Sequence, residues 1–164
     1  MPVRHEYVLA LPAAGPWAPP PLPAGLVARA ITVTDVQLLA GLMLAAYRGT
    51  IDYEGEEMAE AVAEVEGYFS GADGNAPLPQ HSVALVRDDV IESACMVKHW
   101  LRRDCPLVAY VMSTADRKRQ GLAAFVLGRT IAQLRRAGYS ELRAVITEGN
   151  VASERLFQRA GFRR

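Results

Sequence analysis

The sequence is short of cysteine and histidine. Cys95 and Cys105 are the two cysteines among 164 residues, and His5, His81 and His99 are the three histidines. Two thiols are too few for the disulfide framework of a secreted protein. The histidines stand at no metal-ligand spacing from either cysteine, so the sequence predicts no metal site.

Long hydrophobic runs are also missing. No apolar stretch reaches the roughly 20 residues that a membrane-spanning helix needs, and the N-terminus lacks the apolar core of a signal peptide. Hydrophobic residues make up 51% and charged residues 22% of the chain, which is typical of a folded globular domain. We therefore expect a cytoplasmic protein with no membrane partner.

Neither sign of charge is in excess, because the formal net charge is zero. The balance hides an asymmetry: seven basic and fifteen acidic residues precede position 117, and eleven basic and three acidic residues follow from Arg117 onward. Such a split indicates either an anion site in the C-terminal part or mutual attraction of the two halves. No series of stacking aromatics accompanies the basic residues, so no nucleic-acid partner is expected.

Proline is abundant at one end of the chain. Seven of the ten prolines lie in the first 23 residues, where they prevent a helix, because proline lacks the N–H and restricts the preceding residue. The sequence predicts a Pro/Ala-rich N-terminal arm over residues 1–26, followed by a single domain over residues 27–164.

Hydrophobic periodicity predicts regular structure from residue 27 onward. The expected elements are a strand at 27–34, helices at 34–47 and 55–69, strands at 82–87, 90–98 and 107–112, a helix at 119–137, a strand at 140–147 and a helix at 151–160. This β-α-α-β-β-β-α-β-α order predicts an α/β (α+β) fold, with one mixed central sheet and helices on both faces.

The segment 110–123 (YVMSTADRKRQGLA) combines a strand end, a short basic turn and a helix start. A helix N-terminus offers unpaired N–H groups and a positive dipole end, which suit a phosphate. Arg117, Lys118 and Arg119 oppose that dipole until an anion arrives, and Gly121 permits close approach to the backbone. Neither nucleotide fingerprint, G-x-x-x-x-G-K-S/T or G-x-G-x-x-G, occurs. The segment indicates a phosphate site or, as the alternative, a solvated basic turn.

Two segments, 118–123 (KRQGLA) and 150–162 (NVASERLFQRAGF), together resemble the acetyl-CoA-binding half of the GNAT superfamily of N-acetyltransferases. In that family an Arg/Gln-x-x-Gly-x-Gly/Ala loop follows the fourth strand, and an Asn-x-x-Ala/Ser-x-x-Leu-Tyr-x-x-x-Gly-Phe helix completes the site. The chain departs from the pattern at Lys118, which replaces Arg or Gln, and at Phe157, which replaces the tyrosine.

The resemblance implies transfer of an acyl group, with acetyl expected first, from acyl-CoA to an amine by direct attack. Acetyl-CoA or another acyl-CoA would be the co-substrate. Backbone groups of 111–113 would pair with the pantetheine arm, and those of 119–124 would cradle the pyrophosphate. The implied cofactor-binding residues are Val111, Met112, Ser113, Lys118, Arg119, Gln120, Gly121, Leu122, Ala123, Ala124, Asn150 and Phe157.

Two features leave alternatives open. In many relatives the tyrosine replaced by Phe157 protonates the departing thiolate, which phenylalanine cannot do. A module that binds acyl-CoA without turnover is therefore the second hypothesis. The family also usually adds a final strand after the position of Phe162. Without that strand, either the sequence is truncated, or the corresponding edge of the sheet is left open, or the proline-rich arm covers this edge.

The residues that would handle the acceptor are less marked. Glu148, just past a strand, is the first candidate for the general base, and Tyr110 is the second. Tyr53 and Glu54 stand where the substrate-recognition helices of the family begin, and the acidic helix after them would attract a cationic amine or form a solvated face. The expected partner is a small-molecule or peptide amine, and a homodimer is common among such domains.

Overall fold

The computed structural model describes residues 1–12, 18, 20–114 and 120–164. Its strands are β1 (Arg4–Ala10), β2 (Val27–Ala30), β3 (Val83–Arg87), β4 (Val90–Trp100), β5 (Cys105–Ser113) and β6 (Glu141–Thr147). Its longer helices are α1 (Val36–Tyr47), α2 (Met58–Ser70), α3 (Leu122–Arg136) and α4 (Val151–Arg159), and two short 3-10 turns cover Val33–Asp35 and Pro79–His81.

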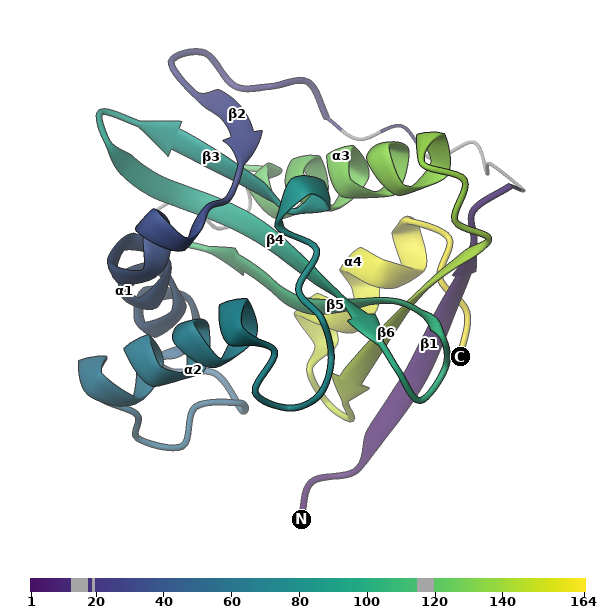
Figure 1. Ribbon diagram of the computed structural model, residues 1–164, viewed down its shortest axis with the longest axis horizontal. Coiled ribbons are helices and arrows are strands. Elements are labelled where there is room, and N and C mark those ends of the chain that lie inside the picture. The colour runs from purple at the N-terminus through teal and green to yellow at the C-terminus, as the bar shows by residue number, and fades with distance from the viewer. Residues whose placement is uncertain (13–17, 19, 115–119) are drawn as a thin grey trace.

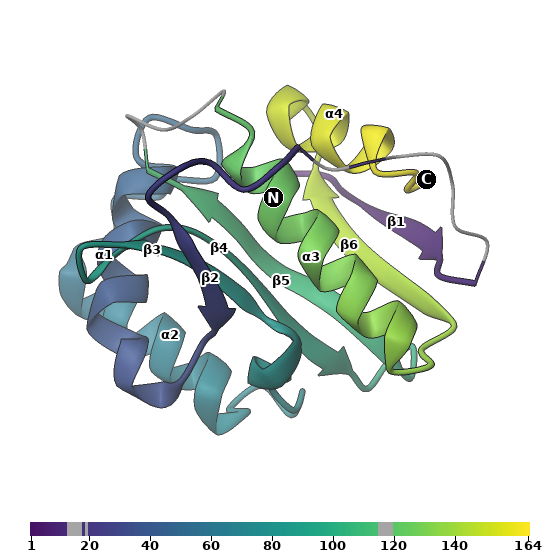
Figure 2. The same ribbon diagram turned by 90° about the horizontal axis from the view of Figure 1, so that it is seen from above.

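The six strands form one mixed sheet in the order β1-β6-β5-β4-β3-β2, in which β5 and β6 are parallel and the other neighbours antiparallel. Helices α1 and α2 cover one face, and α3 and α4 cover the other (Figures 1 and 2). Each helix pair has its own core, because apolar residues of α3 and α4 pack with one set of sheet residues and those of α1 and α2 with another. The predicted mixed sheet with helices on both faces is confirmed.

Strand β1 differs from the sequence-based expectation of an arm over residues 1–26. Arg4–Ala10 pair antiparallel with Glu141–Thr147 of β6 over seven residue pairs, and they occupy the edge for which no strand was expected. No proline lies between Arg4 and Ala10, and Tyr7 and Leu9 point into the core with 4% and 7% of their surface exposed. Alternating buried side chains therefore make a strand here, and the proline-rich stretch begins only after it.

The parallel strands β5 and β6 stay together over a short length. Their register contains two pairs, Leu107 with Arg143 and Val108 with Ala144, although both strands are described throughout. A bulge on β5 coincides with the end of this pairing, because Val97 of β4 faces Val108 whereas the preceding residue, Met96, faces Tyr110. A bulge bends its strand and increases its twist. Beyond Val108 the two strands therefore separate toward their carboxyl ends.

Two helices begin at the separated strand ends. Helix α3 follows β5 with Gly121 as its N-cap, and α4 follows β6 with Asn150 as its N-cap. The start of α3 lies three residues later than the predicted position 119. The start of α1 also differs. Thr32 and Asp35 form the capping box of the 3-10 turn that leads into α1, and Asp35 rather than the predicted Thr34 is the N-cap of α1.

Candidate active site

A cavity of about 500 Å³ lies at the point where β5 and β6 separate. Its walls come from both strands, from the end of α1 and the segment after it, from one side of α2, and from the start of α4. The carboxyl ends of parallel strands are where open α/β sheets bind ligands. The topology therefore provides a binding site, and the side chains that line it decide what it binds.

Acidic side chains dominate the charged lining of this cavity. The carboxylates are Asp52, Glu56, Glu60 and Glu64, and the cations are Arg4 and Lys98. The Lys98 ammonium is already engaged, because its Nζ lies 2.6 Å from Oδ2 of Asp73. That hydrogen bond also holds the pKa of Asp73 below its usual range. The cavity consequently presents an excess of negative charge to a ligand.

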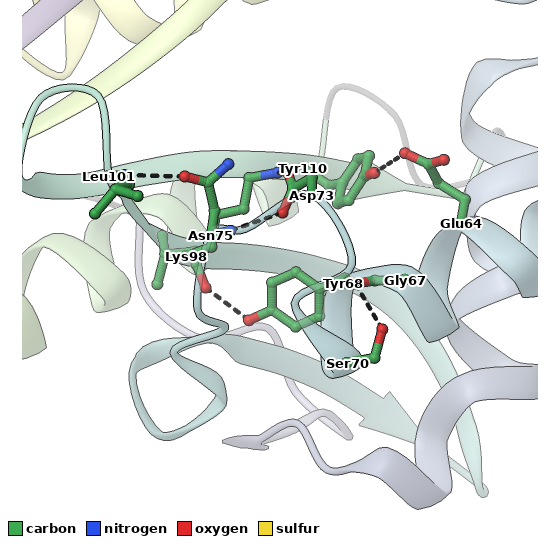
Figure 3. A network of polar contacts seen from close by, with 10 residues as sticks. Glu64, Gly67, Tyr68, Ser70, Asp73, Asn75, Lys98, Leu101 and Tyr110 are labelled. Carbon is green, nitrogen blue, oxygen red and sulfur yellow. Dashed lines mark hydrogen bonds and ion pairs between the residues drawn. The ribbon is translucent and has the colours of Figure 1, made fainter.

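Tyr110 reaches α2 because of the bulge on β5. Val108 packs into the α3 side of the sheet, whereas Ala109 and Tyr110 both pack against the α1–α2 side, so the bulge reverses the usual alternation. The Tyr110 hydroxyl donates a hydrogen bond to Oε1 of Glu64 (Figure 3). Burial, the hydrogen bond to Glu64 and the nearby negative charge all raise the pKa of Tyr110.

Tyr47 and Tyr53 also line the cavity. Burial, followed by the charge of Asp52, raises the pKa of Tyr47 above its ordinary value. The Tyr53 hydroxyl donates to the backbone carbonyl of Glu56 at 3.3 Å. The Tyr47 phenol therefore stays protonated near neutral pH, and both tyrosines supply hydroxyl groups to the wall.

Asn150 connects α4 to the acceptor side of the cavity. Its side-chain oxygen accepts a hydrogen bond from the Ser153 N–H at 3.2 Å, which caps α4. Its Nδ2 donates to Oδ2 of Asp52 at 2.7 Å, across 98 residues of sequence. The predicted site residue Asn150 thus has two partners, and one of them orients a carboxylate of the cavity wall.

The three β5 residues assigned to the pantetheine arm have different surroundings. Val111 lines the cavity, whereas Met112 and Ser113 are buried, with 1% and 8% of their surface exposed. Ser93 of β4 donates from Oγ to the Met112 carbonyl at 2.8 Å and lies 3.0 Å from the Ser113 hydroxyl. These contacts hold the end of β5 rigidly against β4, on the side away from β6.

The described part of the predicted phosphate loop is Gln120–Ala124, because Lys118 and Arg119 lie outside the described residues. Gly121 adopts φ +79°, a left-handed conformation that favours glycine. A Cβ placed on Gly121 would lie 3.0 Å from Cγ of Pro20. Pro20 therefore lies against Gly121, the residue predicted to let a phosphate approach the backbone. The Leu122 side chain is buried in the core, which leaves its backbone for a ligand.

Phe157 lines the cavity from α4 and is otherwise buried, with 5% of its surface exposed. Its ring packs edge-to-face on Phe162, with 4.9 Å between the centroids and 87° between the planes. It supplies an apolar wall to the cavity and no proton donor.

Two predicted acceptor residues lie away from this cavity. Glu148 pairs with His5 of β1, with 2.9 Å between Oε2 and Nε2, and it is not among the residues that line the cavity. Glu54 does not line it either, and its backbone N–H donates to the Glu56 carboxylate. Nothing in the sequence indicated that β1 would stand beside Glu148, because the strand was not expected.

Other lining residues were missed as individual site residues. Glu60 and Glu64 belong to the acidic helix that the sequence predicts at 55–69, and Asp52 directly precedes the predicted acceptor residue Tyr53. Their four-residue spacing places Glu60 and Glu64 on one side of α2. The sequence carried that spacing, but it did not show that this side faces the sheet.

A family model described as the acetyltransferase (GNAT) family matches residues 46–162. The match covers more than half of the sequence and includes both motif segments. The chain belongs to the GNAT family of acetyltransferases. The predicted family is thereby confirmed, whereas a search of the curated proteins finds no match to this sequence.

Solved structures share the GNAT fold at low sequence identity. A GCN5-related N-acetyltransferase from Sphaerobacter thermophilus is 19% identical to this chain with a TM-score of 0.69, and the alignment covers 99% of this chain and 49% of that one. A tandem GNAT protein from the clavulanic acid biosynthesis pathway is 14% identical with a TM-score of 0.70, covering 98% of this chain and 50% of its own. The chain thus spans about half the length of these two proteins.

A third structure is comparable to this chain in length. The ribosomal-protein-S18-alanine N-acetyltransferase from Escherichia coli is 17% identical with a TM-score of 0.63, and the alignment covers 84% of this chain and 77% of that one.

Among the described residues of the GNAT chain, no group of His, Cys, Asp and Glu side chains is arranged to hold a metal ion. Within the same residues, no helix has the length and apolarity to cross a bilayer.

Proposed function

We propose that this chain is an N-acetyltransferase that moves an acetyl group from acetyl-CoA to a cationic primary amine by direct attack. The observation that supports it most is the opening between β5 and β6, which adjoins two helix starts and an acidic cavity. When bound, acetyl-CoA supplies the activated thioester. The chain binds and orients acetyl-CoA and the amine, and it removes a proton from the amine.

The residues present fit acetyl-CoA in two respects. Beyond Val108, β5 has no register partner in β6, so an extended amide-bearing arm can pair with the strand as a neighbouring strand does. The start of α3 offers backbone N–H groups around Gly121, which suit a pyrophosphate. Val111 and Phe157 would flank the arm with apolar surface.

The acceptor side of the cavity favours a cation. Four carboxylates of α2 and the segment before it line this side: Asp52, Glu56, Glu60 and Glu64. Among the described residues, their hydrogen-bond donors are backbone N–H groups, the Tyr110 hydroxyl and the Asn150 amide, and no lysine or arginine forms an ion pair with them. An amine that carries a positive charge is attracted by such a lining. Glu148 has no part in this proposal, because it pairs with His5 outside the cavity.

Thermal unfolding and thiol release together test the proposal. At about 100 times its Kd, a single-site ligand stabilises the folded state by about 2.7 kcal/mol, which for a domain of this length raises Tm by roughly 5–10 °C. We expect that rise with acetyl-CoA and not with adenosine. Release of free CoA thiol should then appear with at least one of a panel of primary amines, which includes pentylamine and cadaverine.

Binding without turnover is the second candidate, and Phe157 favours it. A general acid typically contributes ~10²–10⁴-fold, and the Phe157 ring has no proton to donate. A thiol pKa near ~8.5 still makes thiolate a tolerable leaving group. A Tm rise without thiol release from any amine would select this candidate, and no rise with acetyl-CoA would contradict both.

A further inference from the structure

We propose that Tyr110 and Glu64 form a two-residue proton relay that removes the proton of the acceptor ammonium and delivers it to a second hollow beside the cavity. The inference rests on the acetyltransfer proposed above. It assigns the contact with the substrate proton to Tyr110, and it makes Glu64 a positioning residue that acts through the Tyr110 hydroxyl.

The geometry places this pair between two spaces. The second hollow has a volume of about 260 Å³ and lies between α2, the segment around Asp73, and strands β4 and β5. Tyr110, Glu64 and Lys98 line both this hollow and the main cavity. The Tyr110 hydroxyl donates to Glu64 (Figure 3), whose side chain is exposed to solvent. Because the Glu64 side chain is exposed and lines the second hollow, a proton that reaches its carboxylate along this hydrogen bond can leave to water.

The chemistry requires such a path. An alkyl ammonium with a pKa near ~10.4 carries no lone pair at neutral pH, so it must lose a proton before the N–C bond to the acyl carbon forms. In the relay the ammonium proton passes to the Tyr110 oxygen while the phenolic proton of Tyr110 passes to the Glu64 carboxylate. The N–C bond then forms and the C–S bond breaks with its electron pair on sulfur. The second proton of the amine nitrogen passes to that thiolate, which leaves the amide and free CoA thiol, and Glu64 releases its proton to water.

Tyr110 cannot act as the base alone. Burial and the adjacent Glu64 carboxylate raise its pKa, so the phenol stays protonated at neutral pH and can accept a proton only by giving up its own. Other charged or titratable groups also face it. These are Tyr47 of α1, Asp52 after α1, Asp73 after α2 and Lys98 of β4. The Lys98 charge is paired with Asp73, which leaves Glu64 as the hydrogen-bonded acceptor for the phenolic proton.

The test compares Tyr110→Phe, Glu64→Gln and the double variant with the unaltered chain, using the best amine of the panel. We expect each single change to lower kcat by about 10²-fold, a typical value for loss of a general base. The double variant should be no slower than the slower single variant, because the two residues act as one unit. For the unaltered chain, kcat/KM should vary little from pH 6 to 9. In the variants log kcat/KM should rise with a slope of about one, because only the free amine reacts.

Two other glutamates of α2 provide controls. Glu60→Gln removes the same charge from the same cavity wall without touching Tyr110, so it should raise KM and leave the pH profile flat. Glu66 does not line the cavity, so Glu66→Gln should leave the activity unchanged.

Some outcomes would overturn the relay. Losses in the two single variants that multiply in the double variant, or equal pH profiles for Glu64→Gln and Glu60→Gln, would do so while the proposed function stands. A chain that binds acetyl-CoA and acetylates no amine would overturn the acetyltransferase and the relay together.

Discussion

At the residue scale, Asn150 shows how one side chain serves two purposes. Its oxygen caps α4 and its amide orients Asp52. Replacing it by alanine removes both contacts, whereas serine keeps an oxygen for the cap and loses the amide donor. We expect Asn150→Ala to lower the free energy of unfolding by roughly 2–3 kcal/mol and Asn150→Ser by about 1 kcal/mol, since an N-cap is worth about 0.5–2 kcal/mol and a hydrogen bond to a charged group about 1.5–3 kcal/mol when buried, less where solvent reaches it.

Urea unfolding and steady-state kinetics check this prediction. Both variants should raise KM for the acceptor, because each releases Asp52, and only Asn150→Ala should lose the cap. Equal stabilities of the alanine and serine variants would show that the Ser153 contact contributes nothing to the folded state.

The sequence revealed some individual residues and not others. Asn150 was named because the segment 150–162 resembles the GNAT pattern, and Gly121 because it stands at the basic helix start and in the other segment of that pattern. The contact of Asn150 with Asp52 was not found, because the two residues are 98 positions apart. Tyr110 was named as a candidate base. Its partner Glu64 was not, since the bulge that turns Tyr110 toward α2 leaves no pattern in the sequence.

At the scale of elements, the start of α3 meets Pro20 at Gly121. A Cβ there would require a left-handed alanine and would lie 3.0 Å from Pro20. Gly138, just past the other end of α3, also has a positive φ, +89°, but nothing lies within 4 Å of its Cβ position. It therefore provides a matched control for the conformational cost.

We expect Gly138→Ala to lower the free energy of unfolding by about 1–2 kcal/mol, the cost of a left-handed alanine. Gly121→Ala should cost more, roughly 2–3 kcal/mol, since a side chain is added against Pro20 as well. The same change should weaken acetyl-CoA binding, whereas Gly138→Ala should not. Chemical unfolding and ligand titration measure both effects. Equal losses of stability with unchanged affinity would mean that neither Pro20 nor a phosphate lies close to Gly121.

The elements were predicted well where periodicity is local. Helices α1, α2, α3 and α4 and strands β3 to β6 lie close to their predicted positions. Strand β1 was missed because the prolines that follow it dominated the composition of residues 1–26. Its seven residues contain the required alternation, but its partner β6 begins about 130 residues later. Only long-range pairing identifies such a strand.

At the scale of the whole molecule, the charge asymmetry has a structural counterpart. Acidic residues of α2 and of the segment before it gather at the acceptor side of the cavity. The basic residues 117–119 lie outside the described residues, and in the sequence they directly precede the start of α3. The sequence indicated an anion site in its C-terminal part, which agrees with a pyrophosphate at the start of α3 as proposed. The sequence did not decide whether the acidic face of the helix is solvated or forms an acceptor site. The reason is that packing determines which side of α2 faces the sheet.

The acidic lining predicts that salt weakens the capture of multiply charged acceptors. Between about 0.1 M and about 1 M salt the Debye length falls from about 10 Å to about 3 Å, so attraction by several carboxylates is screened. We expect kcat/KM for cadaverine, with two charges, to fall at least about threefold more than kcat/KM for pentylamine, with one. The double variant Glu56→Gln/Glu60→Gln should flatten the difference. Glu54→Gln/Glu66→Gln, which removes equal charge away from the cavity, should keep it. Equal salt dependence for the two amines would mean that the carboxylates form a solvated helix face and take no part in acceptor capture.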